Sequence, residues 1–149
     1  LLNNELTDFS FRPEREGVPV ANRAGPGKRP RSSMAPTIAF DASGRPVLVA
    51  GSPGGSRIIG YVAGALARVL GHGMHPQQAV EARHVINRNG PITEIEKGEG
   101  AASLAAALEA LGHKVKARGL TSGLHLIRIT EQGLQAGVDP RREGMAAGD

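Results

Sequence analysis

The sequence contains no cysteine and no tryptophan, and only one tyrosine and three phenylalanines occur among its 149 residues. Without cysteine, disulfide bonds, cysteine nucleophiles and thiolate metal sites are excluded. Proteins bind single-stranded nucleic acids largely by stacking bases on aromatic side chains. The scarcity of aromatic residues therefore argues against a nucleic-acid partner, even though the net charge is +4. No apolar run approaches the ~20 residues that cross a bilayer, so we expect no membrane span.

The remaining composition is that of a globular domain with an aliphatic core. Hydrophobic residues make up 40% of the chain, and its length is enough to bury a core. The 21 glycines and 10 prolines indicate many turns. We therefore expect one domain over residues 1–149.

The clearest local pattern lies around residues 37–50. Two short apolar runs flank a turn that contains aspartate, serine and glycine, which predicts a β-hairpin. The segments before and after a hairpin leave it at the same end. We therefore expect Ser32 and Ser33, which precede it, to lie near Gly54 and Gly55, which follow it.

Gly54 and Gly55 also stand just before a predicted helix. Apolar residues recur at the spacing of one helical face over residues 58–70, and Ser56 is a candidate N-cap. At a helix N-terminus the first N–H groups are unpaired and the dipole is positive, which favours an anion or a developing oxyanion. Glycines in such a turn can also serve conformation alone. The phosphate-binding pattern G-x-x-x-x-G-K-[S/T] is absent.

Helices and strands alternate along the rest of the chain. Pro76, a residue typical of the first helical position, predicts a second helix to about residue 83, and leucine spacing predicts a third over residues 101–111. Polar and apolar patterns predict further strands, at residues 92–96, 114–116, 125–129 and 135–138. These elements indicate an α/β or α+β domain.

Two pairs of polar residues have spacings that a binding site could use. Glu5 and Asp8 are three residues apart, so one helical turn points both carboxylates the same way, and spacing alone favours a solvated turn over a cation site. His72 and His75 are followed by Pro76 and have no well-spaced third ligand. We interpret them as helix-end residues and expect no metal site.

Three motifs resemble those of one enzyme family. The chain reads LLNNELTDFS at residues 1–10, PGKRPRSSMAPT at residues 26–37 and GSPGGSR at residues 51–57. In this order and near this spacing, they are similar to the small subunit of the γ-glutamyltransferases, which are N-terminal-nucleophile hydrolases. A weaker likeness continues to the Asp-Pro-Arg run at residues 139–141. The resemblance implies an α+β fold, in which this chain is the C-terminal portion of a four-layer αββα sandwich.

The resemblance also implies how the chain is divided. Residues 1–31 form the edge of the substrate pocket, and residues 32–149 form the core of strands and helices. Residues 11–31 are basic and rich in glycine and proline, which predicts a loop. This loop is shorter than the lid loop of many relatives, and the interval from Asp8 to Ser32 has no aromatic residue beyond Phe9 and Phe11. Because the chain starts without methionine, on residues that resemble the end of a strand, we expect a fragment or a processed product.

Four residues are assigned to substrate binding by the resemblance alone. Glu5 and Asp8 match the positions that bind the α-amino group of the γ-glutamyl moiety. Ser32 and Ser33 match the pair that hydrogen-bonds its α-carboxylate, helped by an arginine from the large subunit. Each serine hydroxyl is able to donate one hydrogen bond to a carboxylate oxygen.

The reaction implied is transfer of the γ-glutamyl group of glutathione or a related amide to water, an amino acid or a peptide. The nucleophile is a threonine exposed when an inactive precursor cleaves itself, and the Gly54 and Gly55 amides form the oxyanion hole. That threonine lies upstream of Leu1, so we expect this chain alone to be inactive. The implied partner is the large subunit of the same precursor. No cofactor is implied, and the implied location is periplasmic or secreted.

Two alternatives stay open. One is an acylase of the same fold for glutaryl or cephalosporin amides, and the other is a binding module without chemistry. Asp8 favours the γ-glutamyl reading, because a carboxylate there is useful only for a substrate that carries an amine. Residues 82–88 depart from the family pattern, so the sequence does not define which acceptor of the γ-glutamyl group is preferred.

Overall fold

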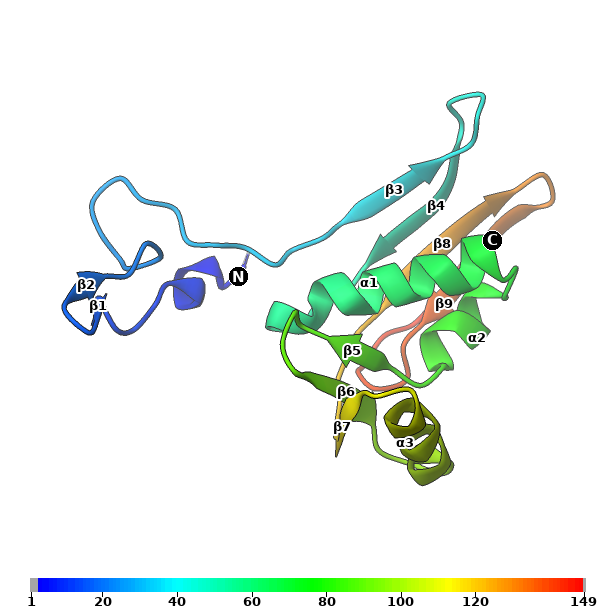
Figure 1. Cartoon of the computed structure of the whole chain (residues 1–149). Helices are drawn as coiled ribbons and strands as arrows, with labels where there is room; N and C mark the ends of the chain where they lie inside the picture. The colour runs from blue at the N-terminus through cyan, green and yellow to red at the C-terminus, as the bar shows by residue number, and fades with distance from the viewer. Residues whose placement is uncertain (1–2, 149) are drawn as a thin grey trace. The chain divides into compact units, whose positions relative to one another are not determined.

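The computed structural model describes residues 3–148 and divides the chain into two compact units, Leu1–Ser33 and Met34–Asp149 (Figure 1). Each unit is described by itself. In the described part of the chain, no helix is both long and apolar enough to cross a membrane.

The first unit is small and is built from turns. A 3-10 helix, η1 (Glu5–Asp8), is followed by two short strands, β1 (Glu14–Arg15) and β2 (Val18–Pro19), which pair antiparallel. Glu16 and Gly17 join these strands with φ values of 53° and 76°, and two positive φ angles are what a type I′ hairpin turn requires. The predicted loop over residues 11–31 therefore contains a hairpin that its composition did not indicate.

The second unit contains two sheets. Strands β3 (Thr37–Phe40), β4 (Pro46–Gly51), β8 (His125–Thr130) and β9 (Gly133–Val138) form an antiparallel sheet in the order β3-β4-β8-β9. Strands β5 (Val85–Asn87), β6 (Ile92–Glu96) and β7 (Lys114–Arg118) form the other sheet. There β6 and β7 run parallel, joined by helix α3 (Ala101–Ala110). The predicted hairpin and later strands are confirmed.

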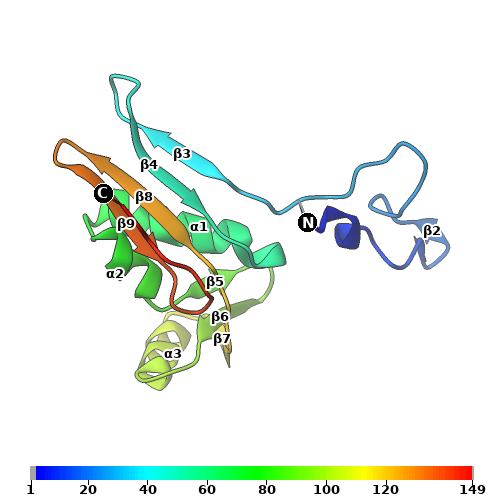
Figure 2. The same ribbon diagram turned by 180° about the vertical axis from the view of Figure 1, so that it is seen from behind.

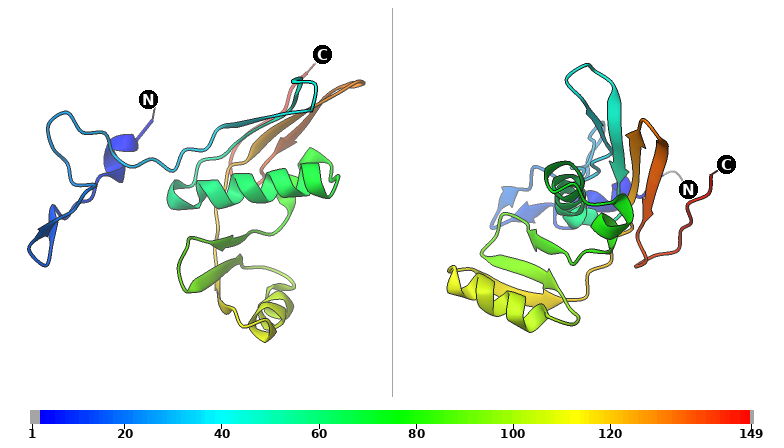
Figure 3. Two further views of the ribbon diagram at one scale, coloured as in Figure 1. Left: turned by 45° about the horizontal axis from the view of Figure 1, so that its top comes forward. Right: turned by 90° about the vertical axis from the view of Figure 1, so that its right-hand side faces the viewer.

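Two helical segments pack on one face of the four-stranded sheet. The first comprises η2 (Gly55–Arg57), α1 (Ile58–Leu66) and the π-helical turn η3 (Ala67–Gly71), and the second is α2 (Pro76–Glu81). Helix α1 contacts β4 and β5, and α2 contacts β8 and β9. Figure 3, in its right panel, looks along α1 and shows it between the two sheets.

The core lies around α1. Buried residues from β4, from α1 and from β8 meet there, among them Leu48, Tyr61, Val62, Ala65 and Leu126. Gly60 lets α1 approach the second sheet closely, because a Cβ at this position would lie 2.8 Å from Cδ1 of Ile86. Both sheets are thus packed against one helix.

The helix boundaries are confirmed, but the predicted N-cap is wrong. Arg57 precedes α1, without a side-chain cap, and the Ser56 hydroxyl instead accepts a hydrogen bond of 3.0 Å from Arg88. The 3-10 turn η2, which includes Gly55, leads directly into α1, and α1 starts at Ile58, where its apolar pattern begins. Pro76 begins α2 as expected.

The opposite face of the four-stranded sheet is apolar and exposed. Ile38, Val49 and Ile127 are neighbours in register on three adjacent strands, with exposed fractions of 54%, 38% and 42%. Their sequence neighbours Leu48 and Leu126 point into the core. Figure 2 shows this face without a helix of the second unit over it. Contiguous apolar surface of this kind is normally covered by a partner.

We expect this chain, purified alone, to self-associate and to bind a hydrophobic dye because of this apolar row. A Val49→Thr/Ile127→Thr variant keeps β-forming side chains and should shift the light-scattering mass toward the monomer. Leu111→Ser, at an exposed position after α3, is the control and should not. A monodisperse parent chain without dye binding would contradict the prediction.

Candidate active site

In the first unit, Glu5 and Ser32 are brought together. Both acidic residues of the predicted pair lie on η1 and are half-buried, as expected for a single helical turn. The Ser32 hydroxyl donates a hydrogen bond of 2.9 Å to Oε1 of Glu5. A hydroxyl and a carboxylate therefore stand side by side, although 27 residues separate them in sequence.

Asn22 holds this arrangement and was missed by the sequence analysis. Its side-chain amide donates to the Asp8 carbonyl at 2.6 Å, and its Oδ1 accepts from the Arg31 N–H at 2.8 Å. Asn22 thereby links Asp8, the last residue of η1, to Arg31, the residue before Ser32. An asparagine within a glycine- and proline-rich loop gives no periodic signal that would have revealed this role.

The glycine pair adopts two different conformations. Gly54 has φ 141°, and a Cβ there would lie 2.7 Å from a ring carbon of the buried Tyr61. Both the backbone conformation and the close contact with Tyr61 therefore require glycine at this position. Gly55 has φ 57°, and nothing lies within 4 Å of an added Cβ. Among residues 3–148, no hydrogen bond is donated by either amide. Both N–H groups are therefore available at the start of the helical segment.

The loop before the glycines is anchored through Ser52. Its hydroxyl donates to the Pro53 carbonyl at 2.7 Å and accepts from the Gly123 N–H at 3.3 Å. This ties the turn after β4 to the segment that precedes β8. The expected proximity of Gly54 and Gly55 to Ser32 and Ser33 concerns two separate units and stays a prediction.

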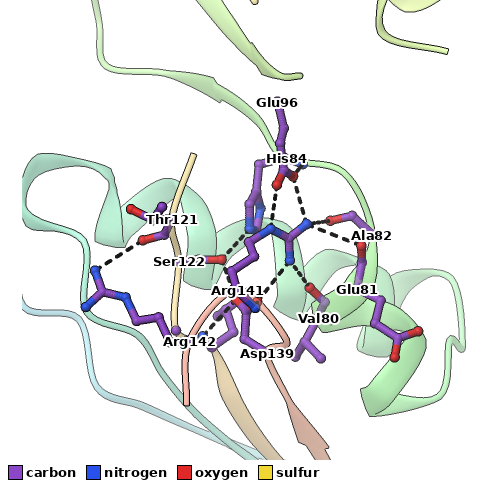
Figure 4. Close-up of polar contacts among 12 residues, drawn as sticks. Val80, Glu81, Ala82, His84, Glu96, Thr121, Ser122, Asp139, Arg141 and Arg142 are labelled. Atoms are coloured by element: carbon purple, nitrogen blue, oxygen red, sulfur yellow. Dashed lines mark hydrogen bonds and ion pairs between the residues drawn. The ribbon is translucent and has the colours of Figure 1, made fainter. Parts of the chain in front are cut away.

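His84, Ser122 and Asp139 form a buried chain of hydrogen bonds that resembles a hydrolase triad only in composition (Figure 4). The Ser122 hydroxyl donates to Oδ2 of Asp139, and Nε2 of His84 lies 2.6 Å from the Ser122 oxygen. Because the hydroxyl proton is committed to Asp139, His84 must be the donor to Ser122. The serine lies between the other two groups and is fully buried, so this order provides no activated nucleophile.

Arg141 completes the network from the C-terminal side. Its Nε and Nη2 donate to the two oxygens of Glu96 at 2.6 and 2.7 Å, and its Nη1 donates to Oδ1 of Asp139 at 3.0 Å. The same guanidinium reaches the carbonyls at the end of α2, with Val80 at 2.7 Å. The two carboxylates, the Ser122 hydroxyl and the Arg141 guanidinium are therefore all paired, as burial requires.

These contacts fix the charge states of the network. Burial favours neutral forms of Glu96 and Asp139, but hydrogen bonds from Arg141 and Ser122 outweigh it and lower the pKa of both carboxyls. Burial and then the positive charge of Arg141 lower the pKa of His84 to about 4. The network therefore carries a neutral histidine between ionised groups at neutral pH.

The histidines near α2 are helix-end residues, as predicted. His75 is the N-cap of α2, where its Nδ1 accepts from the Gln77 N–H at 3.2 Å, and His72 caps the end of η3. Within the described residues, no group of three histidine or acidic side chains is placed to hold a metal ion.

The arrangement of strands and helices matches solved structures. The crystal structure of Helicobacter pylori gamma-glutamyltranspeptidase T380A mutant aligns with a TM-score of 0.77 and 32% identity, over 95% of this chain and 81% of that one. The α+β fold of the N-terminal-nucleophile hydrolase type is thereby confirmed.

Sequence comparison identifies the family more specifically than the fold does. The family model for gamma-glutamyltranspeptidase matches residues 1–149, and the chain belongs to this family. The glutathione hydrolase proenzyme of Escherichia coli K12 is 38% identical over 95% of this chain, which spans 25% of that protein's length. The Acylase ACY 1 proenzyme of Pseudomonas sp. SE83 is 34% identical over 93% of this chain and 24% of its own length.

The neutral state of His84 makes stability depend on pH. The pKa of His84 is about 4 when folded and about 6.5 when unfolded, so the unfolded state binds more protons between these values. The contribution of neutral His84 to the free energy of unfolding is therefore present above pH 6.5 and is lost as the pH falls toward 4. We expect the free energy of unfolding to fall by about 2 kcal/mol from this group between pH 7 and pH 5.

Urea unfolding at several pH values checks this. His84→Asn should flatten the slope between pH 6.5 and 4.5, whereas His113→Asn, at an exposed histidine, should leave it unchanged. A parental slope that is flat across this range would show that His84 is not buried in its neutral form.

Proposed function

We propose that this chain is the C-terminal portion of the small subunit of an enzyme that transfers or hydrolyses the γ-glutamyl group of glutathione and related amides. The observation that carries the proposal is the family match over residues 1–149, which includes all three motifs. The complete enzyme also needs a threonine nucleophile, which we place upstream of Leu1. This chain alone then has no γ-glutamyl activity.

The binding roles follow the charges of a γ-glutamyl substrate, which carries an ammonium and a carboxylate on one carbon. Glu5 and Asp8 receive the ammonium, and Ser32 and Ser33 donate to the carboxylate. The 2.9 Å hydrogen bond from Ser32 to Glu5 supports placing these two groups in one pocket. A serine hydroxyl has one proton, so on substrate binding the Ser32 O–H turns from Glu5 to the substrate carboxylate, and Glu5 then accepts from the ammonium.

The catalytic role of the glycines is stabilisation of charge. The amides of Gly54 and Gly55 donate to the oxyanion that forms when threonine attacks the γ-carbonyl. Their position at the start of the helical segment supports this role, because the dipole of α1 adds positive potential at that end.

The partner is the large subunit, cut from the same precursor in an autocatalytic step. The exposed row of Ile38, Val49 and Ile127 supports this, because it is a sheet face that lacks a covering layer within the second unit. We place the complete enzyme in the periplasm or outside the cell, by family resemblance.

The Asp8 assignment is tested by comparing two substrates in the complete enzyme. Asp8→Asn removes the charge that faces the ammonium, and a charged hydrogen bond contributes about 1.5–3 kcal/mol. We expect kcat/KM to fall roughly tenfold to a hundredfold for γ-glutamyl p-nitroanilide but little for the glutaryl analogue. Glu14→Gln, an exposed acid of the same unit, is the control. An equal loss on both substrates would make Asp8 structural.

The same experiment weighs the acylase alternative. The 34% identity to the Pseudomonas acylase keeps this second function open. A parent enzyme that prefers glutaryl over γ-glutamyl amides would favour it, because such substrates lack the ammonium that Asp8 is proposed to bind.

The oxyanion assignment is tested at Gly55 rather than Gly54, because an added Cβ at Gly54 collides with Tyr61. Gly55→Ala meets open space but tilts or crowds the amide that faces the substrate. Loss of one such donor costs about 2.7–4 kcal/mol, so kcat should fall roughly a hundredfold or more with a smaller change in KM.

Gly44→Ala is the matched control for backbone strain. Gly44 also has a positive φ, 81°, with open space around an added Cβ, but it lies in the turn of the β3–β4 hairpin. If both variants lose the same activity while precursor cleavage persists, the Gly55 effect is strain and the oxyanion role fails.

A further inference from the structure

A buried glutamate in the second sheet is surrounded by more positive charge than it neutralises. Glu94, in the middle of β6, is 3% exposed. Arg57 donates to both of its oxygens, from Nε to Oε2 at 2.7 Å and from Nη2 to Oε1 at 3.1 Å. The hydrogen bonds from Arg57 hold the pKa of Glu94 below its ordinary value, so the group is ionised.

Two further arginines share the same carboxylate. Nη2 of Arg88 donates to Oε1 of Glu94 at 3.2 Å, and Nε of Arg118 lies 2.9 Å from that oxygen. The Arg118 contact is an ion pair without hydrogen-bond geometry, because its buried Nε has no hydrogen-bond partner among the described residues. Three guanidinium groups face one carboxylate, which leaves an excess of two positive charges.

This excess charge borders a pocket. A cavity of about 280 Å³ is lined by Arg88, by the loop residues Gly90 and Pro91, and by Ile92, Glu94 and Arg118. Arg88 and Arg118 are 43% and 42% exposed, whereas the better-paired Arg57 is 25% exposed. The two less satisfied arginines are therefore those that line the cavity. Its polar side suits an anion, and Pro91 and Ile92 give it an apolar side.

The pocket is linked to the glycine pair. Nη1 of Arg88 donates to the hydroxyl of Ser56 at 3.0 Å, and Ser56 directly follows Gly55. Figure 1 shows the loop between β5 and β6 beside the N-terminal end of the α1 segment. An anion in this pocket would thus lie next to the proposed oxyanion site rather than at a remote surface.

We propose that this pocket binds the free carboxylate of the peptide portion of the substrate beyond the scissile amide, in the leaving group or the acceptor. The inference rests on the proposed γ-glutamyl function. The γ-carbonyl has three substituents: its oxygen is assigned to the glycine amides, and its γ-glutamyl chain to residues of the first unit. The amide nitrogen and the peptide attached to it are the part that has no assigned site, and a small carboxylate matches the size and charge of the cavity.

The test uses the complete enzyme and two substrates, a γ-glutamyl dipeptide with a free C-terminal carboxylate and the same peptide with a C-terminal amide. We expect the parent to prefer the carboxylate roughly tenfold in kcat/KM and to lose this preference as salt is raised. Arg118→Gln and, separately, Arg88→Gln should bring the ratio toward one. Arg45→Gln removes an exposed arginine at the distant hairpin turn and should keep the parental ratio.

Each outcome decides between the two proposals. A parent that turns over both peptides equally, or a preference that survives both arginine substitutions, overturns the carboxylate pocket and leaves the γ-glutamyl function standing. A parent without turnover of either peptide or of γ-glutamyl p-nitroanilide overturns the proposed function and this inference with it. The ratio compares two substrates of one preparation, so partial unfolding of a variant does not alter it.

Discussion

The bidentate ion pair between Arg141 and Glu96 is the interaction that the second unit depends on. Glu96 ends β6 in the three-stranded sheet, whereas Arg141 and Asp139 directly follow β9 in the four-stranded sheet. The guanidinium therefore joins the two sheets and also holds the carbonyls at the end of α2. Removing charges from water is costly, and this pair offsets that cost because each of its donors is directed at a protein oxygen.

This connection determines where the proposed chemistry takes place. With both sheets fixed, α1 is held between them, and Gly60 permits its close contact with Ile86. The start of the helical segment, with Gly54 and Gly55, is then fixed relative to the β5–β6 loop that carries the arginine pocket. Rigid elements position charged groups more accurately than loops do, which suits a site that stabilises a transient oxyanion.

The local elements were predictable, because the spacing of apolar residues reflects the period of each strand and helix. Contacts between distant residues left no such trace. Glu94 and His84 are charged or polar residues within buried segments, and their partners lie up to 38 residues away. The two partners of Asn22 are backbone groups, which are present at nearly every residue, so the sequence does not show which ones it binds. Ser56 was misassigned because a cap and a hydrogen-bond acceptor for Arg88 require the same hydroxyl.

The bridge made by Asn22 has a consequence for how the pocket edge tolerates change. Because one side chain fastens the Asp8 carbonyl and the Arg31 N–H, the hairpin of β1 and β2 extends from a closed base. Lengthening a loop that is already closed at its base adds little entropic cost, about 0.6 kcal/mol for each doubling. Insertions at the Glu16–Gly17 turn therefore leave Glu5 and Ser32 in place, so that the size of a lid and the affinity for the glutamyl group are free to vary separately.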